Sequence, residues 1–460
     1  MTVSAEAVAA ATPATRDRYI DLLRVASLGT VVCGHWLMAA VSADGIGNLL
    51  ALVPGLQVLT WGLQIMPVFF FVGGFSHALS HRSLARRTGR PVYADFLRAR
   101  LQRLLRPTLV FVLVWSAAAL ALQLAGAGGG RLTGAALRLV TQPLWFIGIY
   151  LAMVAFTPPL LRLHERFGWG AFAGLAGAAA LVDGLRFALG VPYVEFLNFA
   201  LVWLAVHQLG FLRADGRLGG LRRPAALAAA GLTGAVLLVA FGPYPLSMVG
   251  MPGEKVSNMA PPTLALLCHG LWLVGAVQLL AGPATAWLRR PRVWRGVVAA
   301  NGVAMTAFLW HLTAMLGVYA AQLALGLALP APAGAAWWAQ VPVRLALAAL
   351  VTALLVALFR RFEAPARPAP AAPHGSAPAA PPAGLPAGLP GSGPSAALGI
   401  TLCLLGVLRL SMTGLGGLLE GHSATLIAVP VTAPVAIGMA LGGWLLVERS
   451  APARRVRLRG

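Results

Sequence analysis

Charged residues are scarce in this chain. Only 10% of its 460 residues are Asp, Glu, Lys or Arg, whereas 58% are hydrophobic. Soluble globular domains carry about 25% charged residues, which keep their surfaces hydrated. The composition therefore excludes an ordinary soluble protein and predicts a protein that crosses a membrane several times.

Acidic residues and cysteines are rarer still. The chain has 13 acidic residues, and no connection between its apolar segments holds a paired acidic motif. Glycosyltransferases that use lipid-linked sugars usually need active-site carboxylates, often with a metal ion, so the sequence disfavours that class. The three cysteines, Cys33, Cys268 and Cys403, all lie in apolar segments. Their placement predicts neither a disulfide framework nor a zinc site, and no metal is expected.

The basic residues outnumber the acidic ones, 35 to 13, which gives a net charge of +22. Such a surplus can indicate nucleic-acid binding. Here, however, the arginines cluster in short connections between apolar segments, as the positive-inside rule expects of a membrane protein. The sequence therefore predicts contact with anionic membrane lipids and no binding of nucleic acid.

Twelve apolar segments are long enough to cross about 30 Å of hydrocarbon. They lie near residues 20–41, 57–79, 107–125, 144–162, 170–189, 195–213, 225–242, 261–281, 300–325, 341–360, 397–418 and 424–447. Arginines fill the connections after the second, fourth, sixth, eighth and tenth of these segments. This alternation predicts a multi-pass protein of the cell membrane with both termini in the cytoplasm.

The predicted fold is all-α, a polytopic bundle of membrane helices in five parts. A stretch of Pro, Ala and Gly cannot bury a core, so it is interpreted as a linker between a ten-span body and a two-span tail. The parts are a cytoplasmic N-terminal tail 1–19, a ten-span body 20–362, a linker 363–396, a two-span tail 397–447 and a basic cytoplasmic C-terminus 448–460.

The first apolar segment, IDLLRVASLGTVVCGHWLMAAV, contains two ionisable residues, Arg24 and His35. They are eleven residues apart, which on a helix places them on nearly the same face, about 16 Å apart along the axis. Ionisable side chains at membrane depth are costly and usually face a protein interior or a wet cavity. The pair therefore indicates a functional site, although Arg24 could also simply pair with Asp21, and His35 could be a buried structural histidine.

A second basic feature, FLRARLQRLLRP, precedes the third apolar segment. Arginine recurs there every third or fourth residue, so one helix face is cationic and includes Arg100 and Arg103. Such a face suits the phosphate groups of an anionic ligand. The structural alternative is that these arginines only reach the lipid headgroups.

Further motifs follow in order along the chain. They are MPVFFFVGGFSHAL in the second apolar segment, PLWFIGIYLAMVAFTPPL in the fourth and MTAFLWHLTAM in the ninth. With the first-segment pair and the basic stretch, this set resembles the acyltransferase-3 family of integral-membrane, O-acetyltransferase-like enzymes. The resemblance covers roughly residues 20–360.

The resemblance implies roles for five residues. The Arg-then-His pair of the family corresponds to Arg24 and His35, and its late histidine to His311. Its Arg-x-x-Arg element corresponds to Arg100 and Arg103, or one step later to Arg103 and Arg106. The expected assignment is His35 and His311 as catalytic residues, with Arg24, Arg100 and Arg103 binding the donor.

The sequence departs from the family pattern at one point. The Ser-Gly-Phe of the family's second segment appears here as Gly73, Gly74 and Phe75, which leaves out the hydroxyl.

The expected function is transfer of an acyl group, acetyl in the simplest case, from cytoplasmic acyl-CoA to a hydroxyl of a glycan, lipid-linked or small-molecule acceptor. Histidine suits the base that such a transfer needs, because its pKa lies near neutrality. A twelve-span secondary transporter or exporter is the alternative. The motifs all precede residue 361, so the two-span tail is expected to be dispensable for the chemical step.

Overall fold

The computed structural model describes residues 12–13, 16–42, 45–89, 91–126, 130–251, 254–363, 393–416, 418–419, 423–426 and 429–450. Nearly all of the predicted linker 363–396, most of the predicted basic C-terminus 448–460 and most of the predicted tail 1–19 lie outside the described residues.

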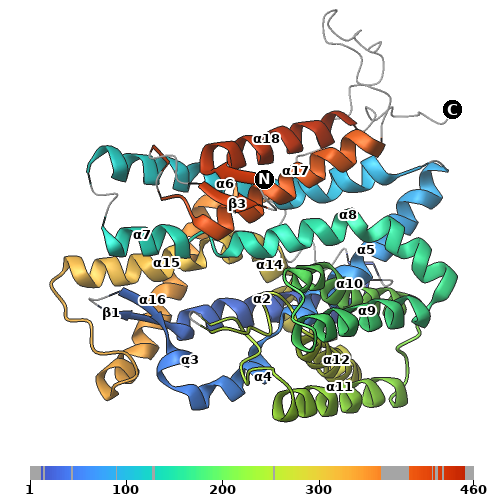
Figure 1. Ribbon diagram of the computed structural model, residues 1–460. Helices are drawn as coiled ribbons and strands as arrows, with labels where there is room; N and C mark the ends of the chain where they lie inside the picture. Colours follow the sequence, from blue (N-terminus) through green and yellow to red (C-terminus); the bar gives the residue numbers. More distant parts are fainter. Residues whose placement is uncertain are drawn as a thin grey trace, which may run out of the picture.

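Within the described part of the chain, helices dominate (Figure 1). The α-helices are α2 (Arg18–Met38), α3 (Leu49–Leu52), α4 (Thr60–Leu63), α5 (Met66–Thr88), α6 (Tyr93–Leu124), α7 (Arg131–Leu139), α8 (Pro143–Phe167), α9 (Trp169–Phe187), α10 (Asn198–Ala214), α11 (Arg222–Phe241), α12 (Leu264–Leu279), α13 (Ala281–Trp287), α14 (Pro291–Asn301), α15 (Ala304–Ala324), α16 (Ala335–Phe359), α17 (Gly393–Thr413) and α18 (Ala433–Ser450). Three short 3-10 helices, η1 (Pro54–Leu59), η2 (Val194–Leu197) and η3 (Arg360–Phe362), extend some of them. Two antiparallel hairpins, β1 (Ala39–Ser42) with β2 (Gly45–Asn48) and β3 (Ser423–Leu426) with β4 (Val429–Thr432), complete the described elements.

Ten helical segments among the described residues are long and apolar enough to cross a membrane, or eleven if the bent pair α12 and α13 counts as one span. This confirms the predicted all-α polytopic fold. The eighth predicted span, 261–281, corresponds to that pair, which bends by 49°. The twelfth, 424–447, begins in the β3–β4 hairpin, and α18 is not among the candidate spans.

Glycine packing brings α5 against α10. A Cβ atom at Gly74 would collide with the carbonyl oxygen of His207, and a Cβ atom at Gly210 would collide with the carbonyl oxygen of Phe71. Small residues let membrane helices approach this closely. Gly74 is therefore required for packing, whereas its neighbour Gly73 has room for a side chain, since Tyr150 is 3.5 Å from the Cβ position.

The last two helices pack on the rest of the bundle. Figure 1 shows α17 and α18 together beside α6 and α8. Leu408 of α17 lies against Gly148 of α8, and Glu448 of α18 accepts a hydrogen bond from Arg98 Nε of α6 at 2.8 Å. The two C-terminal helices thus support the same helix that carries Arg100 and Arg103.

Several helices end together at one face of the bundle. Asp215, just after α10, accepts hydrogen bonds from Arg82 of α5 at 2.6 Å and from His164 of α8 at 2.7 Å. Burial alone would raise the pKa of Asp215, but the bonds from Arg82 and His164 outweigh it and hold that pKa below its usual value. The connections after the second, fourth and sixth predicted spans therefore share one face.

Candidate functional site

A cavity of about 360 Å³ lies where α2, α5, α6, α8 and the junction of α14 with α15 meet. It is lined by Arg16, Arg24, Leu28, Phe69, Val72, Gly73, Ser76, Arg100, Arg103, Leu104, Phe146, Tyr150, Asn301, Gly302, Ala304, Met305 and Glu363. Its volume is in the range of small-molecule sites, and its wall combines apolar surface with four arginines.

All three arginines predicted to bind the donor line this cavity. Arg24 donates to Asp21 Oδ1 at 2.8 Å and to Ser76 Oγ at 3.0 Å. The pairing of Arg24 with Asp21, given above as the structural alternative, is therefore present together with its place in the cavity wall. Asp21 also accepts from Arg16 Nε at 2.6 Å, so one carboxylate orients two of the cavity arginines.

Arg100 and Arg103 reach the cavity from one face of α6. Arg100 donates to the carbonyl oxygen of Ser76 at 3.1 Å and to the hydroxyl of Ser80. Arg103 is exposed and lines the cavity, while Arg106, also exposed, is not among the lining residues. Of the two registers that the sequence left open, the geometry favours Arg100 and Arg103.

Among the described residues, Glu363 is the only acidic one that lines the cavity. Its carboxylate accepts hydrogen bonds from the backbone N–H groups of Met305 at 3.0 Å and Thr306 at 2.9 Å, and so caps the first turn of α15. Burial raises the pKa of Glu363, and the hydrogen bonds from Thr306 and Met305 partly oppose that effect. With four arginines against one carboxylate, the lining favours an anionic ligand.

The two predicted catalytic histidines meet, although they are 276 positions apart in the chain. His35 Nδ1 is 2.8 Å from His311 Nε2, and the two rings stack with an interplanar angle of 13°. Helices α2 and α15 run side by side here, and Trp36 Nε1 donates to the carbonyl oxygen of His311 at 3.0 Å. The contact between these helices brings the pair together.

The partners of His311 determine which nitrogen of each neutral ring carries hydrogen. His311 Nδ1 is 2.5 Å from the carbonyl oxygen of Phe308, which can only accept, so this nitrogen donates. His311 Nε2 is then the acceptor, and His35 Nδ1 must donate to it. This tautomer leaves the lone pair of His35 on Nε2, where a base needs it.

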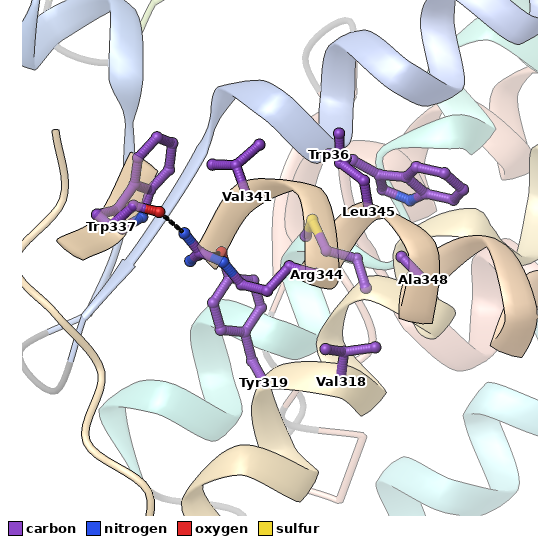
Figure 2. Close-up of a pocket in the computed structure, with 9 residues that line it drawn as sticks. Trp36, Val318, Tyr319, Trp337, Val341, Arg344, Leu345 and Ala348 are labelled. Atoms are coloured by element: carbon purple, nitrogen blue, oxygen red, sulfur yellow. Dashed lines mark hydrogen bonds between the residues drawn. The ribbon is translucent and has the colours of Figure 1, made fainter. Parts of the chain in front are cut away.

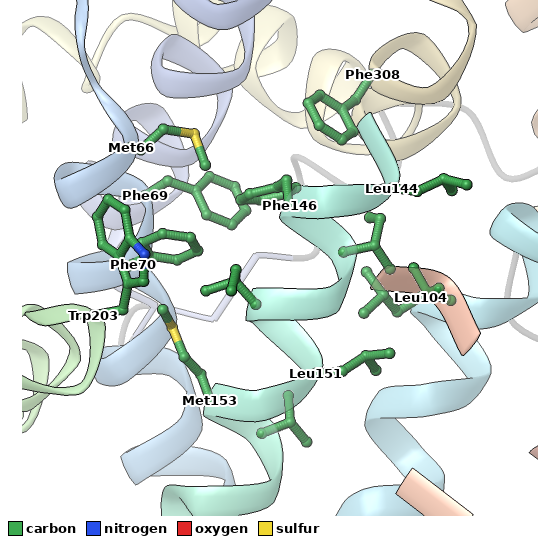
Figure 3. Close-up of a cluster of buried hydrophobic side chains, with 14 of the residues drawn as sticks. Met66, Phe69, Phe70, Leu104, Leu144, Phe146, Leu151, Met153, Trp203 and Phe308 are labelled. Carbon is green, nitrogen blue, oxygen red and sulfur yellow. The ribbon is translucent and has the colours of Figure 1, made fainter. Parts of the chain in front are cut away.

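Two aromatic rings in contact with each other, Phe146 and Phe308, link the cavity to the histidine pair, and both are drawn in Figure 3. Phe146 lines the cavity, and its ring centroid is 4.9 Å from that of Phe308. Phe308 in turn stacks on His311 with centroids 5.7 Å apart. The described structure therefore contains a cationic cavity and a histidine pair linked by a Phe146–Phe308 contact.

The sequence interpretation missed several residues of the cavity. Tyr150 lines it, and its hydroxyl is 2.9 Å from Nε2 of buried His77, whose Nδ1 is 3.1 Å from His207 Nε2. Asn301 and Glu363 also line it. Glu363 lies next to the Pro-rich segment and Asn301 at the end of α14, so nothing local in the sequence marked either residue.

Gly73 takes the place of the serine in the Ser-Gly-Phe pattern described above, so the hydroxyl of that serine is missing here. Gly73 lines the cavity at the position where the family pattern has serine, so this wall is bare of a side chain. Ser76, one helical turn further, is the hydroxyl that α5 provides to the cavity.

Comparison with known proteins gives one match. The family described as an acyltransferase domain, acyltransferase 3, matches residues 17–360. No curated protein and no solved structure matches the chain. The matched range contains Arg24, Arg100, Arg103 and both histidines, leaves out the cavity residues Arg16 and Glu363, and ends before α17.

Proposed function

The chain belongs to the acyltransferase 3 family and is a membrane-bound acyltransferase, and from this premise we propose the identity of its donor and acceptor. The donor is acyl-CoA, with acetyl as the simplest acyl group, and it binds from the cytoplasm. The acceptor is a hydroxyl group of a glycan, a lipid-linked sugar or a smaller alcohol.

The observation that carries the donor assignment is the convergence of Arg24, Arg100 and Arg103 on one cavity. Coenzyme A carries several phosphate charges, and arginine binds phosphate through charge-assisted hydrogen bonds. Arg24 and Arg100 are also held in place by Ser76, which fixes the positions of the two guanidinium groups before a ligand arrives.

The orientation in the membrane follows from the same arginines. Positively charged connections favour the cytoplasmic side, and the helix ends beside three of these connections meet at Asp215. We place both termini and the face around Asp215 in the cytoplasm of a cell whose plasma membrane holds the protein. Membrane lipids are then the immediate neighbours of the apolar outer surface.

The chemical step assigned to the histidine pair is proton removal from the acceptor. His35 Nε2 takes the hydroxyl proton as the oxygen attacks the thioester carbonyl carbon. The carbon–sulfur bond breaks, and the departing sulfur of CoA receives the proton from His35. His311 holds the His35 ring in the required tautomer through the 2.8 Å contact.

The Phe146–Phe308 contact lies on the route from the donor cavity to His35. For the thioester to reach the base, these rings must turn aside when the donor binds. The slim pantetheine arm of CoA can pass such a gap, while its phosphates stay with the arginines.

The direct experiment is an assay of the purified protein in nanodiscs with radiolabelled acetyl-CoA. Wild-type protein is expected to release CoA and to move label to a hydroxyl acceptor or to water. Protein with Arg100→Ala, in which a donor contact is lost, should need more acetyl-CoA for half-maximal release. Wild-type protein that binds a transported solute but never cleaves the thioester would support the transporter alternative instead.

A further inference from the structure

A second, smaller cavity lies between α2, α15 and α16, away from the arginine cavity. Its volume is about 20 Å³. It is lined by Trp36, Met315, Val318, Tyr319, Trp337, Val341, Arg344, Leu345 and Ala348, none of which lines the larger cavity (Figure 2). Figure 2 shows the Arg344 side chain between Tyr319 and Trp337.

Arg344 is a buried cation inside a predicted membrane span. Only 9% of it is exposed, and it donates to the Tyr319 hydroxyl at 2.8 Å and to the carbonyl oxygen of Trp337 at 2.7 Å. Its guanidinium also lies over both rings, 4.7 Å from the centroid of Trp337 and 5.5 Å from that of Tyr319. These partners are neutral, and no carboxylate of the described residues forms an ion pair with Arg344.

Trp337 adds a second donor to the same cavity. Its side chain is 1% exposed, and its indole Nε1 is buried without a hydrogen-bond partner among the described residues. A buried N–H group without a partner costs free energy, and so does a buried guanidinium without a counter-ion. Both costs are removed by one ligand, an anionic oxygen group that accepts from Arg344 and Trp337.

The cavity borders the histidine pair. Trp36, which lines it, follows His35 in the chain and donates to the carbonyl oxygen of His311 at 3.0 Å. The cavity is therefore next to the base, and along α2 the donor-cavity residue Arg24 comes first, then His35, then Trp36. That is where an acceptor must lie if His35 is to reach its hydroxyl.

We propose that this cavity is an acceptor subsite in which Arg344 and the Trp337 indole N–H bind an anionic group, carboxylate or phosphate, of the molecule that is acylated. The proposal rests on the proposed role of His35 as the base. A volume of about 20 Å³ has room for one water-sized group, so a single anionic oxygen enters and the rest of the acceptor stays outside.

A phospholipid headgroup offers the same chemistry from another source. Arg344 lies nine residues into α16, about 14 Å along the helix from Ala335. A headgroup phosphate must reach Arg344 past the first turns of α16, whereas an acceptor at His35 is next to Trp36, which lines the same cavity. This favours the acceptor as the source of the anion.

The binding test uses glucuronate and glucose, which differ by a carboxylate, and measures the melting temperature of the protein in nanodiscs. Saturating CoA is present throughout, so that the arginine cavity is already filled. Glucuronate should stabilise wild-type protein more than glucose does, and this difference should vanish in Arg344→Gln. An equal difference in wild type and Arg344→Gln would overturn the proposal, as would no difference in wild type.

Two further variants test whether the effect of Arg344→Gln arises from misfolding and not from loss of the binding group. Arg344→Lys keeps the charge and should keep part of the preference, and Trp337→Phe removes only the indole N–H and should reduce it. In transfer assays the KM for glucuronate should rise about tenfold in Arg344→Gln, with the KM for acetyl-CoA unchanged. A shifted KM for acetyl-CoA alone would overturn the acceptor assignment.

The lipid source is tested by adding phosphatidic acid to phosphatidylcholine nanodiscs. If phosphatidic acid stabilises wild type but not Arg344→Gln, and glucuronate has no effect, the ligand is a lipid and the acceptor proposal is wrong. Because the melting measurement needs no turnover, it separates failure of this subsite from failure of the proposed acyltransfer.

Discussion

His35 Nδ1 donates to His311 Nε2 across 2.8 Å, and His311 Nδ1 donates in turn to the carbonyl oxygen of Phe308. This chain of hydrogen bonds gives the two histidines different tasks. His35 keeps a free lone pair on Nε2, whereas both nitrogens of His311 are occupied. In the proposed reaction His35 is therefore the base and His311 the residue that positions it.

The first prediction distinguishes positioning from chemistry at His311. His311→Ala should lower kcat about 10- to 100-fold and leave the KM for acetyl-CoA unchanged, because the tautomer of His35 is no longer fixed. His311→Gln should recover part of the loss, since its side-chain oxygen can accept from His35 Nδ1. Equal activity of the two variants would contradict the positioning role.

The second prediction concerns the donor cavity. Arg100→Ala and Arg103→Ala should each weaken CoA binding about tenfold or more, since charge-assisted contacts contribute about 1.5–3 kcal/mol. Arg106→Ala is the matched control, because Arg106 is on the same helix but outside the cavity lining. Calorimetry with CoA measures all three, and a loss confined to Arg106→Ala would shift the binding register by one turn.

The third prediction is a dependence of donor binding on pH. The pKa of Glu363 is raised by burial, so this carboxyl takes up a proton above the pH at which an ordinary glutamate does. Protonation removes the one negative charge that the described residues contribute to the cavity lining. CoA binding should therefore tighten severalfold as the pH falls from about 7.5 to about 5.

The control for this prediction is Glu363→Gln, which should bind CoA more tightly at neutral pH and lose most of the pH dependence. Measuring with 3′-dephospho-CoA excludes titration of the ligand phosphomonoester. The free energy of unfolding should change with pH in the same direction as CoA binding, because the raised pKa of Glu363 favours the neutral carboxyl in the folded state. Stability from this group is present at low pH and is lost as the pH rises through the folded-state pKa. Identical pH profiles of wild type and Glu363→Gln would refute the assignment.

The fourth prediction separates stability from chemistry in the C-terminal helices. A chain that ends near residue 366 should keep measurable thioester turnover, because no proposed catalytic or donor-binding residue lies beyond Glu363. It should melt at a lower temperature, because α17 packs on α8 and Glu448 pairs with Arg98. Glu448→Gln in the full chain should show a small part of that loss. A folded but inert truncated protein would place the two helices in the active body.

The sequence was enough to select individual candidate residues of the site, but not the contacts between them. Arg24, His35 and His311 could be selected because ionisable residues are rare in apolar segments and therefore conspicuous. Arg100 and Arg103 could be selected because arginine recurs every third or fourth residue before the third apolar segment. The pairing of His35 with His311 could not be predicted, because it depends on which helices are neighbours. Tyr150 and Asn301 gave no signal, since an aromatic or amide residue in a helix usually serves packing.

The membrane-spanning fold was predictable because long apolar segments stand out in the sequence. The errors in the predicted spans have physical causes. Hydropathy identifies each long apolar segment, but it does not reveal the bend between α12 and α13 or the hairpin that precedes α18. Hydropathy also gives no information on which helices pack together. The contact of Leu408 with Gly148 therefore appears only in three dimensions.

The central claim is that His35 is the base, and the most direct measurement compares wild type with His35→Ala in nanodiscs. Transfer of labelled acetyl from acetyl-CoA should fall about 10²- to 10⁴-fold, as expected for loss of a positioned base. CoA binding and the melting temperature should remain close to wild type, because the donor cavity does not include His35. Near-normal transfer by a well-folded His35→Ala protein would contradict this account of the reaction.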